Sequence, residues 1–165
     1  MSNTSATIVP GDKAPDFQLP GINGTEIGLY RLSNLLTSGP VVLGITSATT
    51  GVDRRPVADL SWFDLEQGLD VIVVMSGSTD VHQSRTSARA LGTPVLTDSD
   101  GRVGRTYGMS NPTDERLDAV FLIDNSRFVS LVQVAMNGDD GFDLQAIRNG
   151  IKRFTYGDNN GNEKQ

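Results

Sequence analysis

The stretch that decides the fold is residues 41–63, which reads VVLGITSATTGVDRRPVADLSWF. It begins with a compact apolar run, residues 41–45, whose length and β-branched composition predict a fully buried strand. A glycine-bearing loop follows, and from residue 54 to about residue 67 the apolar side chains keep near-helical spacing. A buried strand, a loop and an amphipathic helix in this order predict the repeating unit of an α/β sheet.

The same alternation continues downstream of this stretch. Residues 70–75 (DVIVVM) predict a second buried strand. Asp80 and Gln83 form a capping-box pattern, because an Asp at the N-cap and a Gln three residues later satisfy free backbone amides reciprocally. That pattern predicts a helix up to Leu91, and a short strand at 95–97 and a short helix at 101–107 are expected after it.

Hairpins are predicted at the two ends of this series. Residues 16–19 and 26–29 flank the turn-rich sequence PGINGT, and residues 119–124 and 128–133 flank DNSR. A last helix is expected over residues 142–154, with Leu144, Ile147 and Ile151 on one face.

The element order predicts a mixed central sheet flanked by helices, an α/β fold of the thioredoxin type with an N-terminal β-hairpin. One domain is expected over residues 1–155. Residues 156–165 are expected to be a disordered tail, because GDNNGNEKQ contains no apolar side chain.

Composition excludes several classes of function. The chain has 165 residues, is 37% hydrophobic and carries a net charge of −6, which argues against nucleic acid or an anionic membrane as a partner. No apolar run approaches the roughly 20 residues of a membrane span. The N-terminal MSNTSATIVP lacks the features of a secretory signal, so a cytoplasmic location is expected. With no cysteine and one histidine, His82, neither thiol chemistry nor a multi-histidine metal site is expected, and no cofactor is predicted.

Several segments together resemble one protein family. They are GDKAPDFQL at 11–19, VVLGITSATTGVD at 41–53, SGSTDVHQSRTS at 76–87, TYGM at 106–109 and LDAVFLID at 117–124. In order and spacing they resemble the peroxiredoxins, most closely the atypical two-cysteine thiol peroxidases, from residue 11 to about residue 154. The resemblance implies the peroxiredoxin type of thioredoxin-like fold and a homodimer.

The departures from the family pattern concern its chemistry. Thr50 matches the family threonine, but Asp53 occupies the position of the peroxidatic cysteine. Thr46 stands at the usual proline, Ser87 at the resolving cysteine, and Asp118 at the arginine that steadies the thiolate. Peroxide reduction needs a soft nucleophile that accepts oxygen and is recycled by thiol exchange, and a carboxylate does neither. The resemblance therefore implies a homologue without peroxidase activity. Natural loss explains the missing arginine better than deliberate replacement of cysteines does.

Asp53 has two readings. As an N-cap it would accept amide hydrogen bonds at a helix start, which is worth about 1 kcal/mol. As a catalytic group it would share a pocket with Asp118, and the repulsion between two carboxylates would raise one pKa toward neutrality. Thr50 and Arg85 would then be orienting donors.

Neighbouring residues complete the predicted site. Arg54 and Arg55 lie at a helix start, where a cation costs about 0.3–1 kcal/mol unless an anion offsets it. Three interpretations are open: the two arginines point to solvent, they pair with Asp53 or Asp118, or they bind an anionic ligand. Arg85 lines the pocket mouth or is an exposed helix arginine. Trp62 lines a pocket or a dimer face. The residues assigned to substrate binding are Arg54, Arg55, Thr46 and Trp62.

Three functions follow from these residues. The first is a cysteine-less homologue that binds a small molecule, in the former peroxidatic pocket, or a protein. The second is a cofactor-free acid/base enzyme that uses Asp53 and Asp118 on a small organic substrate. The third is a thiol peroxidase inactivated by cysteine replacement at positions 53 and 87.

Overall fold

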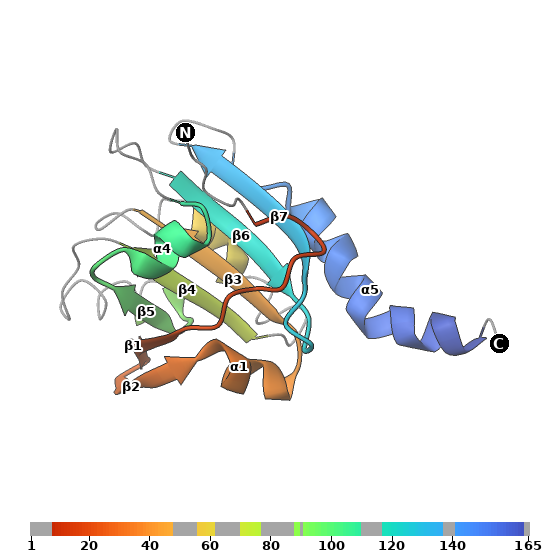
Figure 1. Ribbon diagram of the computed structural model, residues 1–165, viewed down its shortest axis with the longest axis horizontal. Helices are drawn as coiled ribbons and strands as arrows, with labels where there is room; N and C mark the ends of the chain where they lie inside the picture. The colour runs from red at the N-terminus through yellow and green to blue at the C-terminus, as the bar shows by residue number, and fades with distance from the viewer. Residues whose placement is uncertain are drawn as a thin grey trace.

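A computed structural model describes residues 8–47, 56–61, 70–76, 88–89, 91–109, 117–136 and 141–163. Seven strands form one sheet in the order β2-β1-β5-β4-β3-β6-β7 (Figure 1). The strands are β1 (Gln18–Asn23), β2 (Glu26–Arg31), β3 (Val41–Thr46), β4 (Asp70–Ser76), β5 (Val95–Asp98), β6 (Leu117–Ile123) and β7 (Val129–Met136). The helical elements are α1 (Leu32–Leu35), η1 (Leu36–Ser38), η3 (Pro56–Ser61), α4 (Arg102–Thr106) and α5 (Leu144–Glu163).

The predicted sheet topology is confirmed. β3, β4 and β5 are parallel, as expected of strands joined by long crossovers, whereas β6 and β7 are antiparallel additions on one side. On the other side β1 pairs antiparallel with both β5 and β2. The result is the mixed α/β sheet with an N-terminal hairpin that the sequence predicted.

Strict alternation along the central strands builds two hydrophobic layers. In β3, Val41, Leu43 and Ile45 face one layer, and Val42 faces the other. All residues of β3 are buried, so its apolar run is continuous rather than alternating, as is usual for a strand covered on both faces.

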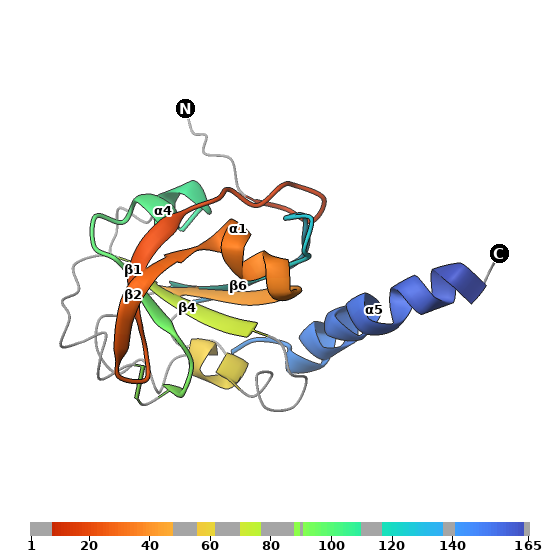
Figure 2. The ribbon, with the colours of Figure 1, turned by 90° about the horizontal axis from the view of Figure 1, so that it is seen from below.

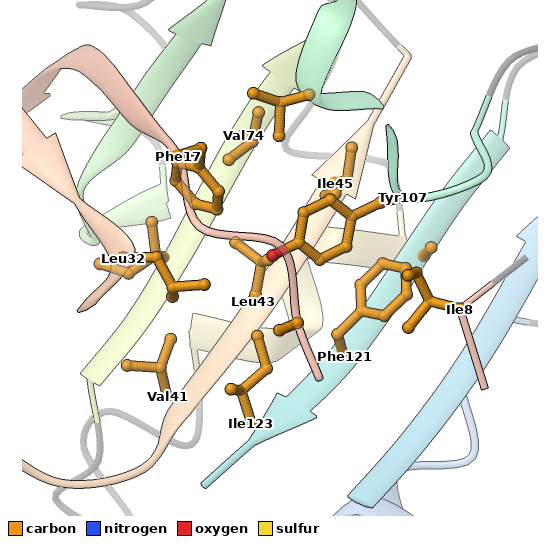
Figure 3. Close-up of a cluster of buried hydrophobic side chains, with 14 of the residues drawn as sticks. Ile8, Phe17, Leu32, Val41, Leu43, Ile45, Val74, Tyr107, Phe121 and Ile123 are labelled. Atoms are coloured by element: carbon orange, nitrogen blue, oxygen red, sulfur yellow. The ribbon is translucent and has the colours of Figure 1, made fainter. Parts of the chain in front are cut away.

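The first layer is closed by aromatic side chains from distant parts of the chain. The ring of Tyr107 stands edge-on to Phe121, with centroids 5.1 Å apart, and to Phe17 at 6.1 Å. Figure 3 shows the Tyr107 ring between Phe17 and Phe121, next to Leu43 and Ile45 of β3. Edge-to-face pairs at such distances contribute about 0.5–1.5 kcal/mol beyond the area that they bury. This packing fixes the N-terminal segment and α4 on one face of the sheet.

The opposite layer is covered by η3 and α5. Seen nearly edge-on, the sheet has α1 and α4 on one side and η3 on the other (Figure 2). A Cβ atom on Gly44 would lie 2.7 Å from Leu60 Cδ1 and 3.2 Å from Val57 Cγ1, so η3 rests directly on the backbone of β3. Ile147 and Ile151 of α5 are buried in the same layer, as the sequence predicted.

The structure departs from the sequence prediction in three main ways. The PGINGT segment is mostly strand, because β1 continues to Asn23 and only Gly24 and Thr25 form the turn. α1 and η1 were not predicted, since so short a segment carries no usable periodicity. The last helix was expected to end near Phe154, within a chain whose residues 156–165 were expected to be disordered, but α5 continues to Glu163. No proline follows Phe154, and two glycines cost only about 1 kcal/mol each in a helix, too little to force a stop.

The helices expected over residues 54–67 and 80–91 lie mostly outside the described residues. Their described parts, 56–61, 88–89 and 91, are helical. In the described part of the chain no helix is both long and apolar enough to cross a membrane.

Candidate functional site

The candidate site lies where β3 ends and β6 begins. Thr46 is the last residue of β3 and pairs in register with Asp118, the second residue of the antiparallel β6. Both side chains therefore point to the same face of the sheet, next to η3. Neither residue is exposed to solvent.

Among the described residues, the Thr46 hydroxyl and the Val57 backbone N–H hold the Asp118 carboxylate. The Thr46 hydroxyl donates to Oδ1 at 2.7 Å, and the backbone N–H of Val57 donates to Oδ2 at 3.0 Å. Val57 is the second residue of η3, where a backbone N–H has no partner within the helix. Asp118 thus caps η3 from a neighbouring strand and ties three elements together.

This geometry brings together two of the eight predicted site residues. Thr46 and Asp118 are in direct contact, whereas their assignments to substrate binding and to catalysis stay predictions. The other six, Thr50, Asp53, Arg54, Arg55, Trp62 and Arg85, lie outside the described residues.

The contact between Thr46 and Asp118 was not foreseen from the sequence. Asp118 was paired with Asp53, and Thr46 was noted only because a threonine replaces a proline. The usable signal was the register of the two strands: a polar residue ends the apolar run of β3, and another begins that of β6.

A second buried carboxylate was missed. Asp98, at the end of β5, is 1% exposed and accepts bonds from the backbone N–H groups of Val103 and Gly104 and from the Ser76 hydroxyl. It holds α4 on the sheet much as Asp118 holds η3. An aspartate after a buried strand and shortly before a short helix is a capping signal that the sequence does contain.

A cavity of about 330 Å³ lies between the start of β1 and α4. Phe17, Leu19, Val103 and Tyr107 form its apolar wall, and Asp16 is among its polar residues. None of the predicted site residues lines this cavity. It is therefore distinct from the place where Thr46 and Asp118 meet.

Among the ionisable groups that line this cavity, Tyr107 and Asp16 both have a perturbed pKa. Burial raises the pKa of Tyr107, whose hydroxyl donates to the Pro15 carbonyl at 2.5 Å. For Asp16, burial favours a higher pKa, but hydrogen bonds from Ser33 and from the Phe17 N–H outweigh it, and the net pKa is lowered. Both groups hold the N-terminal segment in place. Among the described residues, no three His, Cys, Asp or Glu side chains are grouped so that they could hold a metal ion.

Comparison with known proteins agrees with the geometry. The AhpC/TSA family matches residues 10–132. No curated relative matches this sequence. Among solved structures, a 2-Cys peroxiredoxin from Plasmodium vivax superposes with a TM-score of 0.75 and 17% identity, over 92% of this chain and 84% of that one. AhpC from Enterococcus faecalis gives 0.74 and 15%, over 94% and 97%. The mitochondrial 2-Cys peroxiredoxin from Plasmodium falciparum gives 0.72 and 16%, over 93% and 98%. At these identities the superpositions establish the fold, and the peroxiredoxin type predicted from the sequence is confirmed.

Proposed function

The chain belongs to the AhpC/TSA family, and we propose that it is a member without thiol peroxidase activity that acts by binding a small molecule or a protein. One observation carries the proposal: none of the 165 residues of the sequence is a cysteine. The family reaction requires a thiolate that accepts oxygen from the peroxide and a thiol exchange that regenerates it. Neither step has an equivalent for the hydroxyl and carboxylate groups of this chain.

The surroundings of Asp118 support a structural role for that carboxylate. Its two oxygens accept bonds from Thr46 and Val57, and a backbone N–H can only donate, so Oδ2 acts as an acceptor. Asp118 is used here to fix η3 against the sheet. A rigid scaffold of this kind positions the loops that carry a binding surface.

Hydroperoxide consumption tests the first half of the proposal. With hydrogen peroxide or cumene hydroperoxide and a dithiol reductant, the chain is expected to consume no more peroxide than a heat-inactivated sample. Turnover above that background, proportional to protein concentration, would refute the loss of peroxidase activity.

Ligand retention tests the second half. The purified chain is equilibrated with a metabolite extract, washed, denatured, and analysed for released small molecules by mass spectrometry. A compound retained in stoichiometric amount, and lost from a Thr46→Val variant of unchanged fold, is the expected result for a ligand held in the former peroxidatic pocket. If Thr46→Val retains the same compound equally well, the assignment of Thr46 to ligand binding is excluded.

An acid/base enzyme is the second candidate. The observation that favours it is a fully buried carboxylate beside a hydroxyl, an arrangement found in general acid/base sites. It requires Asp53 to approach Asp118, so the NMR titration of Asp53 should shift in an Asp118→Asn variant. A titration unchanged by that substitution excludes the pair. The third candidate, a disabled peroxidase, predicts cysteine codons at positions 53 and 87 of the natural gene.

The cytoplasmic location and the homodimer predicted from the sequence belong to this proposal as well. Gel filtration with light scattering tests the dimer, and imaging of a tagged chain in its own cell tests the location.

A further inference from the structure

The cavity between the start of β1 and α4 has the size of a site for a small molecule. Its volume of about 330 Å³ is at the lower end of the roughly 300–1,000 Å³ that ligand pockets have, so it suits a compact ligand. It lies on the α4 side of the sheet, whereas the Asp118 side chain bonds η3 on the opposite side (Figure 2). The cavity is therefore separate from the place where Thr46 and Asp118 meet.

The floor of the cavity is apolar and partly aromatic. It consists of the buried side chains of Phe17, Leu19, Val103 and Tyr107. The rings of Phe17 and Tyr107 stand edge-on to each other, with centroids 6.1 Å apart (Figure 3). The Tyr107 hydroxyl already donates to the Pro15 carbonyl, so it has no further proton to offer a ligand. Such a floor best accommodates another aromatic ring, because aromatic pairs add to the stabilisation that burial gives.

The rim of the cavity is polar and mainly acidic. Its exposed side chains are those of Asp16, Gln18, Asp100, Arg102 and Thr106, and the buried Asp98 completes the lining. Three carboxylates therefore stand against one guanidinium. Because this excess of negative charge surrounds a space with an apolar floor, it attracts a cation and repels an anion.

Asp16 and Asp100 are the two carboxylates that reach solvent at the rim. Asp98 differs, because donors from α4 and β4 already occupy both of its oxygens. For Asp16, burial favours a higher pKa, but hydrogen bonds to the carboxylate outweigh it and the net pKa is lowered. A backbone N–H bond is the main cause that lowers the pKa of Asp100. Both groups are thus ionised at neutral pH.

We propose that this cavity binds a small aromatic amine, whose ring packs against Phe17 and Tyr107 and whose ammonium group stays at the rim beside Asp16 and Asp100. An ammonium group only donates hydrogen bonds and a carboxylate only accepts them, so the two are complementary. The ring removes apolar surface of the floor from water, which favours binding. The inference goes beyond the proposed function and does not depend on it, because it concerns the other face of the sheet.

NMR titration with three matched compounds tests the chemistry of the ligand. With 2-phenylethylamine, the amide signals of Phe17, Leu19 and Val103 should shift in a saturable way, with a Kd on the order of 1 mM or below. The uncharged 2-phenylethanol should bind at least about threefold more weakly, and the anionic 3-phenylpropionate more weakly still. An absence of saturable shifts at these amides overturns the proposal. So does an alcohol or a carboxylate that binds as tightly as the amine.

Charge variants test the part that the rim plays. Asp100→Asn keeps an oxygen that can accept from the Arg102 N–H, so the local turn is retained. It should raise the Kd of the amine by roughly two- to fivefold and leave that of the alcohol unchanged, because only charge is removed. Combined with Asp16→Asn, it should abolish the preference for the amine. A preference that persists in the double variant refutes recognition by these carboxylates.

Asp70→Asn is the matched control for these charge variants. Asp70 is exposed like Asp100, but it begins β4, and it lies about 20 Å along that strand from Ser76, which pairs with Asp98. The control should bind the amine and the alcohol as the unmodified chain does. If Asp70→Asn weakens the amine as much as Asp100→Asn does, the effect is one of overall charge and the proposal is wrong.

A steric variant tests the place of binding. Thr106 is exposed at the rim, and its hydroxyl bonds only the Arg102 carbonyl of its own helix, so it can be changed without disturbing the core. Thr106→Phe should obstruct the cavity and raise the Kd of the amine at least about tenfold, whereas Thr106→Ala should leave it unchanged. Thr46→Val should also leave it unchanged, which separates this site from the one in the proposed function. Undiminished amine binding by Thr106→Phe, with an unaltered circular dichroism spectrum, would place the ligand elsewhere and refute the inference.

Discussion

Replacing Asp118 with asparagine tests whether this carboxylate holds the fold together. The substitution keeps the size of the side chain and exchanges one carboxylate oxygen for an NH₂ group. In the native chain both oxygens accept, one from the Thr46 hydroxyl at 2.7 Å and the other from the Val57 N–H at 3.0 Å. In Asp118→Asn the NH₂ group must face one of these donors, so at least one bond is lost in a site with no solvent exposure.

The expected cost follows from these contacts. A hydrogen bond to a charged group contributes about 1.5–3 kcal/mol, and a buried polar group left without its partner costs about 1–3 kcal/mol. We therefore expect Asp118→Asn to lower the free energy of unfolding by about 2–4 kcal/mol. Thr46→Val removes only one donor and should cost about 1–2 kcal/mol. Because the two residues share a bond, the double variant should be less destabilised than the sum of the single variants, by about 1 kcal/mol.

Urea denaturation followed by circular dichroism measures these differences. With a slope of about 2 kcal/mol per molar urea, Asp118→Asn should move the midpoint down by about 1–2 M. Asp70→Asn is the matched control, because Asp70 also begins a strand but is exposed, and it should change stability by less than about 0.5 kcal/mol. If Asp118→Asn leaves the free energy of unfolding unchanged or raises it, the carboxylate does not stabilise the fold. The catalytic interpretation of Asp118 is then favoured instead.

Three shorter predictions concern the rest of the scaffold. Gly44→Ala forces a Cβ to within 2.7 Å of Leu60 and should cost about 1–3 kcal/mol in urea denaturation. Gly28→Ala, where the new Cβ would lie 3.9 Å from Tyr30 Cε1 in ordinary contact, should cost less than about 1 kcal/mol. The folded pKa of Asp16 is lowered from its ordinary 3.8, so its contribution to stability is present above that pH and is lost as the pH falls through the folded pKa. The stability difference between the native chain and Asp16→Asn should accordingly shrink in denaturation curves below pH 4. Tyr107→Phe removes the bond to a backbone carbonyl and should lower Tm by about 2–6 °C in calorimetry.

The sheet was predictable because its central strands depend on local pattern. Three apolar runs of buried length, at 41–45, 70–75 and 95–97, all became parallel strands. The amphipathic spacing of Ile147 and Ile151 likewise placed the start of α5 on the sheet. A strand that is buried on both faces of a sheet needs a continuous apolar run, so such a run in the sequence predicts the strand directly.

Elements that depend on distant partners were not predictable in the same way. Nothing in the local sequence of Asp118 shows that its oxygens reach Thr46, 72 positions away, and the N–H of Val57, 61 positions away. The turn after β1 was misjudged for a related reason. PGINGT contains turn residues, but Ile22 is buried and pairs with both Ile27 and Val95, and this tertiary pairing overrides the local preference.

The bond between Thr46 and Asp118 also bears on the hypothesis that the family cysteines were lost naturally. By the family resemblance, a proline and an arginine are expected at these two positions. A proline at position 46 would offer no hydroxyl to Oδ1 of Asp118, and an arginine at position 118 would set a donor against the donating N–H of Val57. Each replacement therefore suits the other, and neither is a plausible step in removing cysteines on purpose. The two residues complete one buried hydrogen-bond network that positions η3, and this mutual fit supports our hypothesis that the family residues were lost naturally and were not replaced on purpose.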